Sequence, residues 1–105
     1  MNLEKVLNRY FPMNDTMFYI LFSLMQERHG YGIMQHVKEL TKGRIILGAG
    51  TVYSSLKKLE GDGLITGIHE EDRKKTYMIT RLGMELLQKE AQRIKEIYQN
   101  LEGLL

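Results

Sequence analysis

The most constraining feature of this 105-residue sequence is an apolar spacing typical of helices, which is interrupted once by a short segment with the pattern of β-strands. Up to Glu60, apolar residues recur three and four positions apart, which is the spacing of amphipathic helices. Leu64–His69 and Lys75–Thr80 then read as strands, and the charged residues EEDRK between them suit an exposed hairpin loop. Helical spacing returns after Thr80. We therefore predict a mainly helical fold with one small β-hairpin.

Glycine and proline divide the helical parts of the chain. We predict helices over residues 2–10, from an N-cap at residues 14–16 to Gly30, over residues 31–42, from residue 50 or 51 to 60, and from an N-cap at Thr80 to about Leu101. Three core helices followed by a two-stranded wing form a winged helix-turn-helix, whose third core helix lies in the DNA major groove. We assign residues 1–80 to this winged-helix domain with its N-terminal helix, and residues 81–105 to a C-terminal dimerisation helix.

Composition excludes several kinds of function. The chain has no cysteine, which removes disulfides, thiolate metal sites and cysteine nucleophiles. Its three histidines lack metal-ligand spacing, and no phosphate-binding glycine loop or nucleophile motif is present. We predict that the protein is not an enzyme and has neither metal nor cofactor. The formal net charge of +2 only weakly favours an anionic partner.

The N-terminal segment does not resemble a signal peptide, because charged residues interrupt it. The longest apolar-rich stretch, Met17–Met25, is about half of the ~20 residues that cross a bilayer. We expect a cytoplasmic protein without membrane contact.

Three blocks resemble the PadR-like transcriptional regulators, the phenolic acid decarboxylase regulator family. They are HGYGI at His29–Ile33, GTVYSSLKKLEGDGLI at Gly50–Ile65 and TYMITRLG at Thr76–Gly83, in the order and spacing of that family. The single trailing helix is similar to that of short-form members. The resemblance implies a homodimer on a palindromic operator, usually a repressor, and often a response to small hydrophobic or aromatic effectors. No cofactor is implied, and the partners are duplex DNA and a second copy.

The helix that begins at residue 50 or 51 is the candidate recognition helix. Val52, Leu56 and Leu59 are expected to face the core. The other side carries small hydroxyls and two lysines, which suit base edges and phosphates: Thr51, Ser54, Ser55, Lys57 and Lys58. The alternative is that these residues form an ordinary solvated helix face.

Aromatic and basic residues outside this face are further candidates for DNA contact. The Tyr53 ring can pack in the core while its hydroxyl reaches a phosphate, and the Tyr31 hydroxyl can donate to a phosphate. The alternative for Tyr31 is a core tyrosine at a structural turn. At the wing tip, Arg73, Lys74 and Lys75 suit the minor groove or the phosphates, with Arg73 favoured for its guanidinium. Three acidic residues precede them, so a plain solvated loop is the alternative.

The last predicted helix carries a heptad seam, the pattern by which one helix packs on another. We assign dimerisation to Leu87, Ala91, Ile94, Tyr98, Leu101 and Leu105. A lone helix that extends past a small domain cannot bury such a stripe, whereas a second copy can. The alternative is that the helix folds back on its own domain.

An effector site is the least constrained prediction. Seven methionines can line an adaptable pocket, although methionine is more often core filler. The aromatic walls of such a site would be Phe11, Phe18 and Tyr98. The sequence therefore predicts a sequence-specific DNA-binding regulator. The alternative is a winged-helix protein-interaction module without DNA binding, since fold alone does not settle function.

Overall fold

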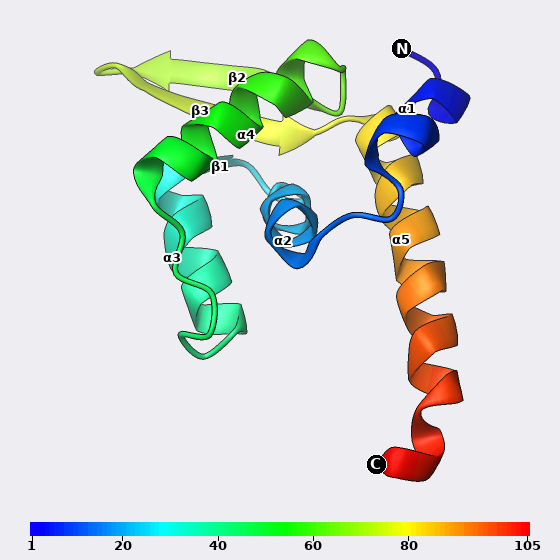
Figure 1. Cartoon of the computed structure of the whole chain (residues 1–105). Helices are drawn as coiled ribbons and strands as arrows, with labels where there is room; N and C mark the ends of the chain where they lie inside the picture. The colour runs from blue at the N-terminus through cyan, green and yellow to red at the C-terminus, as the bar shows by residue number, and fades with distance from the viewer.

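The computed structural model describes residues 1–105 as five α-helices and three strands (Figure 1). Their order is α1 (Leu3–Tyr10), α2 (Asp15–Ser23), β1 (Arg28–His29), α3 (Gly30–Leu40), α4 (Ala49–Gly61), β2 (Ile65–Glu71), β3 (Lys74–Ile79) and α5 (Arg81–Asn100), followed by the short 3-10 helix η1 (Glu102–Leu104). This arrangement confirms the predicted winged helix-turn-helix with a long C-terminal helix.

Side-chain caps fix the start of four helices. Asn2, Asn14, His29 and Thr80 each accept a hydrogen bond from the backbone N–H three residues further on. Such bonds satisfy donors that a helix leaves unpaired in its first turn. The caps predicted at residues 14–16 and at Thr80 are therefore confirmed.

Helix α2 ends earlier than the sequence predicted. It stops at Ser23 instead of continuing to Gly30, because the following segment turns into strand β1. The Leu24 carbonyl accepts a hydrogen bond from the Ile79 N–H at 2.7 Å, which ties this turn to the end of β3. Met25, the last residue of the apolar-rich stretch in the sequence, is 43% exposed in this turn.

The sheet has three strands rather than the predicted two, in the order β1-β3-β2. Arg28 pairs with Tyr77, so β1 lies on the free edge of the central strand. The strands also run closer to the turn than predicted, because Glu70, Glu71 and Lys74 belong to them, while Leu64 and Thr80 lie outside them. Its turn consists of Asp72 and Arg73, both with positive φ, as a tight two-residue hairpin turn requires.

One hydrophobic core joins the helices to the sheet. Its sixteen buried residues include members of all five α-helices, among them Leu86 and Leu87 of α5, and Ile65 of β2. The first half of α5 is therefore part of the core of the winged-helix unit, across the boundary drawn at residue 80. The second half of α5 extends away from the other elements, as Figure 1 shows. It does not fold back on its own domain.

This projecting helix makes the molecule elongated, with principal extents of 51 × 34 × 20 Å. None of its helices combines the length and apolar character that crossing a bilayer would require.

Candidate nucleic-acid interface

Helix α4 presents one polar face to solvent and one apolar face to the core. Val52, Leu56 and Leu59 are buried, as predicted. Thr51, Tyr53, Ser54, Lys57 and Lys58 are exposed. The prediction that Ser55 lies on the exposed face is wrong: only 8% of it is exposed. Ser55 lies three residues after buried Val52 and next to buried Leu56, so the turn of the helix carries it inward.

The N-terminal end of α4 is open to an approaching partner. Its N-cap residue is Gly48, which offers no side-chain hydrogen bond to the first turn. A Cβ atom added at Gly48 or Gly50 would meet no atom within 4 Å. The free N–H groups of a helix N-terminus favour anions, and phosphates above all. The arrangement can therefore accept a phosphate close to the backbone.

Two tyrosines lie beside this helix end. The Tyr53 ring covers Gly30, where an added Cβ would lie 2.8 Å from the ring. The neighbouring Tyr31 is 61% exposed, and its hydroxyl accepts a hydrogen bond from Gln35 Nε2 at 2.9 Å. Both hydroxyls are therefore carried by the region where α3 and α4 meet, with Tyr31 the more exposed.

At the wing, the basic residues differ in their surroundings. Lys74 lies opposite Glu71 in the strand register, and Arg73 occupies the tip of the turn. Lys75 donates from Nζ to Glu60 Oε2 of α4 at 3.2 Å, and this contact raises the pKa of Lys75. Arg73 is thus the basic residue of the wing with neither a strand partner nor an ion pair. Lys75 instead joins the wing to α4.

A hydrogen-bonded cluster that the sequence did not indicate holds the base of the wing. Glu27 Oε2 accepts from the Thr76 hydroxyl at 2.5 Å and from His69 Nδ1 at 2.7 Å, and these bonds lower the pKa of Glu27. Thr76 lies opposite a bulge in β2, where it also accepts from the His69 N–H. Glu27 is 42 and 49 residues from its partners in sequence, so no local pattern could identify the cluster.

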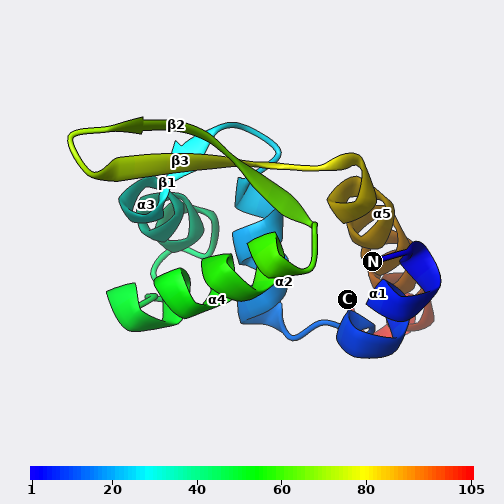
Figure 2. The same ribbon diagram turned by 90° about the horizontal axis from the view of Figure 1, so that it is seen from above.

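Figure 2 shows where these parts lie relative to one another. The wing tip and the N-terminal end of α4 lie on one side of the molecule, while α1 and α5 lie on the other. The wing tip and the N-terminal end of α4 are therefore separated from the candidate dimerisation helix, whereas Lys58, nearer the other end of α4, lies against Tyr10 of α1.

The dimerisation residues fall into two groups. Leu87 is 5% exposed, since it packs in the core of its own chain. Ala91, Ile94, Tyr98, Leu101 and Leu105 are exposed on the projecting half of α5 and its C-terminal end. Ile97 and Leu104 extend this apolar surface, which nothing in the single chain covers.

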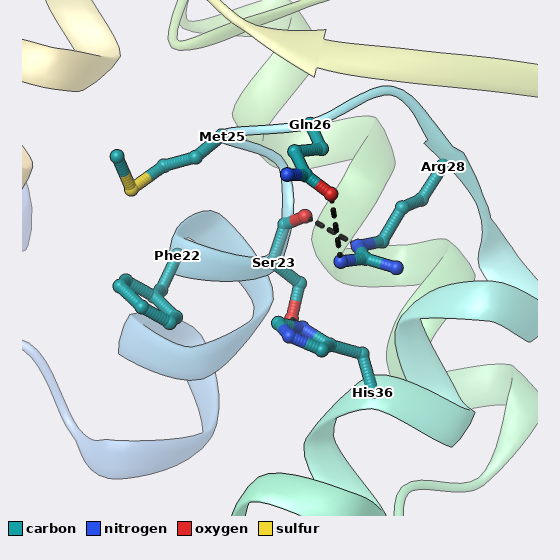
Figure 3. A pocket seen from close by; sticks show the side chains of 6 residues that line it. All are labelled: Phe22, Ser23, Met25, Gln26, Arg28 and His36. Atoms are coloured by element: carbon teal, nitrogen blue, oxygen red, sulfur yellow. Dashed lines mark hydrogen bonds between the residues drawn. The ribbon is translucent and has the colours of Figure 1, made fainter.

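The three predicted effector residues do not meet in the single chain. Phe18 stacks on Phe22 of its own helix, Phe11 is 40% exposed after α1, and Tyr98 is 54% exposed on distal α5. A cavity of about 360 Å³ lies elsewhere, between the end of α2 and α3 (Figure 3). It is lined by Phe22, Ser23, Met25, Gln26, Arg28 and His36, and so by none of the three predicted residues.

Comparison with known proteins gives a consistent family. The model of the transcriptional regulator PadR-like family matches residues 18–89. The Escherichia coli transcriptional regulator YqjI is 27% identical over 96 residues, which are 90% of this chain and 46% of that protein. The match to the family model confirms the resemblance to PadR-like regulators that the sequence indicated. The family consists of transcriptional regulators, in agreement with the prediction that the chain is not an enzyme.

Solved structures agree with the fold. A PadR family regulator from Clostridium difficile superposes with a TM-score of 0.74 at 24% identity, covering 87% of this chain and 98% of that chain. Bacillus subtilis PadR in complex with operator DNA has a TM-score of 0.62 at 30% identity, covering 74% of this chain and 47% of that chain. The chain spans 22% and 46% of the lengths of two curated relatives that it matches.

Proposed function

Because this chain belongs to the PadR-like family of transcriptional regulators, we propose that it binds duplex DNA sequence-specifically as a homodimer. Two copies joined through α5 would place two α4 helices in successive major grooves, roughly 34 Å apart on one face of the duplex. The operator would be palindromic, and the usual consequence of occupying it would be repression. The protein would act in the cytoplasm, where its DNA target is accessible.

The observation that carries this proposal is the exposed face of α4. It combines an uncapped N-terminus, small hydroxyl side chains and Lys57 on a helix whose opposite face anchors in the core. Hydroxyl groups can bond to base edges, while lysine neutralises phosphates. Tyr31 of α3 and Arg73 of the wing would contact the DNA phosphate backbone on either side of α4. The operator complex of Bacillus subtilis PadR supports this reading for a relative of the same fold.

The dimer part of the proposal is supported by the apolar surface on distal α5. A large contiguous patch of exposed apolar side chains marks an interaction site, and here exposed apolar residues follow the heptad seam from Ala91 to Leu105. A small hydrophobic or aromatic effector would then bind between two copies. In the single chain Phe11 and Tyr98 are exposed, whereas Phe18 stacks on Phe22 of its own helix.

The test is selection of bound duplexes from a random-sequence pool, followed by affinity measurement at several salt concentrations. We expect one enriched palindrome. Lys57→Ala should weaken binding and reduce the slope of log affinity against log salt by about one unit, as the loss of one phosphate contact requires. Lys5→Ala, an exposed lysine on α1 rather than on α4, is the matched control and should leave the slope unchanged.

Two outcomes would contradict the proposal. An unchanged slope for Lys57→Ala would remove this lysine from the phosphate-contacting set. Folded protein that enriches no sequence and shows no salt-sensitive binding would exclude DNA binding, and would favour the protein-interaction module instead.

A further inference from the structure

The C-terminal end of α4 is held by an ionised side chain that the DNA-binding proposal does not use. Asp62 is the C-cap residue of α4. Its Oδ2 accepts a hydrogen bond from the Tyr10 hydroxyl at 2.6 Å, and its Oδ1 accepts from Arg9 Nη1 at 2.7 Å. Both donors come from the last turn of α1, more than fifty residues away in sequence.

An aspartate at this place is unfavourable on local grounds. The C-terminus of a helix carries partial negative charge, so a carboxylate there is destabilising unless cations or donors surround it. Here two donors from α1 occupy its two oxygens. The hydrogen bond from Tyr10, with that of Arg9, lowers the pKa of Asp62, which is therefore ionised at neutral pH. The unfavourable carboxylate at the end of α4 is thus stabilised by α1, which indicates that Asp62 serves to join these two helices.

The contact with α1 continues along α4. Lys58 places Nζ 5.1 Å from the centroid of the Tyr10 ring, within the range of a cation–π interaction. Lys58 and Asp62 are four residues apart, so they lie on the same side of α4. Tyr10 therefore contacts the last turn of α4 through both its ring and its hydroxyl.

Helix α1 is in turn fixed to α5. Val6 and Tyr10 lie in the same core as Leu86 and Leu87. The Met13 N–H, just after α1, donates to Glu90 Oε1 at 2.7 Å, and Glu90 is completely buried in α5 and bonded by Arg93. Figures 1 and 2 both show α1 beside the first half of α5. A continuous chain of contacts thus runs from α5 through α1 to the end of α4.

We propose that Tyr10, Arg9 and Asp62 are positioning residues that set the angle of α4 relative to α5, and so the spacing of half-sites that a dimer accepts. This inference rests on the proposed function. Helix α4 has 13 residues and is about 20 Å long, so a small tilt at its C-terminal end moves the N-terminal end that faces DNA. Loss of the contact should loosen spacing discrimination more than it changes general DNA affinity.

The test compares wild type with Tyr10→Phe, which removes one hydroxyl and keeps the ring in the core. The probes are the palindrome recovered from selection, the same palindrome with one base pair inserted at its centre, and a scrambled duplex. We expect wild type to bind the inserted duplex at least tenfold more weakly than the palindrome, and Tyr10→Phe to discriminate less than about threefold. Affinity for the scrambled duplex should not change.

A second variant guards against misfolding. Arg9→Lys keeps a cation near Asp62 and should retain most of the spacing discrimination, whereas Arg9→Met should lose part of it. Far-UV circular dichroism and sedimentation establish that each variant is a folded dimer before it is compared.

The outcomes separate the two proposals. If folded wild type recovers no palindrome, the proposed function fails and this inference fails with it. If wild type discriminates between spacings and folded Tyr10→Phe discriminates equally well, the inference alone is wrong. It is also wrong if Tyr10→Phe weakens binding to all three duplexes by the same factor.

Discussion

Gly83, in the first turn of α5, is a position where only glycine fits without a steric clash. Thr80 Oγ1 accepts from the Gly83 N–H at 3.1 Å and donates to the Gly63 carbonyl at 2.6 Å. A Cβ atom at Gly83 would overlap the Leu64 carbonyl oxygen and lie 2.7 Å from Ile79. Glycine is required here by the close approach of two backbones.

We predict that Gly83→Ala lowers the free energy of unfolding by about 1–3 kcal/mol, the usual cost of forcing an extra methyl group into a packed site. The obstructing atom belongs to the backbone, so it cannot move aside as a flexible side chain could. Urea unfolding measures the change. The matched control is Gly61→Ala, where no atom lies within 4 Å and a helical alanine should be neutral or stabilising. Equal stability of Gly83→Ala and wild type would disprove the steric argument.

At the scale of elements, α1 and α4 are joined by hydrogen bonds to the ionised Asp62 side chain. Asp62 is 11% exposed at its side chain, and its pKa lies below the ordinary value in the folded chain. A depressed carboxylate pKa stabilises the fold above the unfolded-state pKa, about 3.9, and this contribution is lost as pH falls through the folded-state pKa. The α1–α4 contact should therefore weaken in acid.

Asp62→Asn tests this contact by stability rather than by DNA binding. At pH 7 we expect a loss of about 1–3 kcal/mol, since hydrogen bonds to an ionised group are removed. The difference in unfolding free energy from wild type should shrink as the pH falls below about 4, because the wild-type carboxylate then becomes protonated. Chemical unfolding at about pH 7 and at about pH 3 measures both. Asp72→Asn at the exposed wing tip should change stability by no more than about 0.5 kcal/mol.

At the scale of the whole molecule, the shape of the single chain is itself informative. Its core is complete in the winged-helix unit and the first half of α5, while apolar side chains continue along the projecting half. Ile94, Ile97 and Leu101 are each at least 40% exposed there. A helix that carries such residues beyond its own core is stabilised by packing against a second helix.

We predict that Ile94→Glu prevents formation of the proposed dimer, because pairing would bury an unpaired charge at a cost of several kcal/mol. Sedimentation equilibrium measures the association. Gln99→Glu introduces the same charge off the seam, on the outer side of the helix, and should leave the dimer intact. A folded Ile94→Glu dimer with wild-type affinity would rule out the seam.

The sequence by itself determined the local features of this protein. Apolar spacing and capping residues identified all five helices and the hairpin, and they assigned Val52, Leu56 and Leu59 of α4 to the core. The wing residues EEDRK were correctly placed around a turn, although the turn itself is only Asp72–Arg73. These features depend on residues a few positions apart, so their physical causes are visible in a short window.

Only the tertiary structure decided the features that join distant segments. Strand β1 exists because β3 offers it a free edge, and Ser55 is buried because of how α4 packs on its neighbours. Lys75 is paired with Glu60 across fifteen residues, and Tyr10 with Asp62 across fifty-two. Each of these contacts forms only when distant elements pack together, and the spacing of residues along the chain does not reveal that packing. Apart from Ser55, the exposed face of α4 was therefore readable from sequence, whereas what holds that helix in place was not.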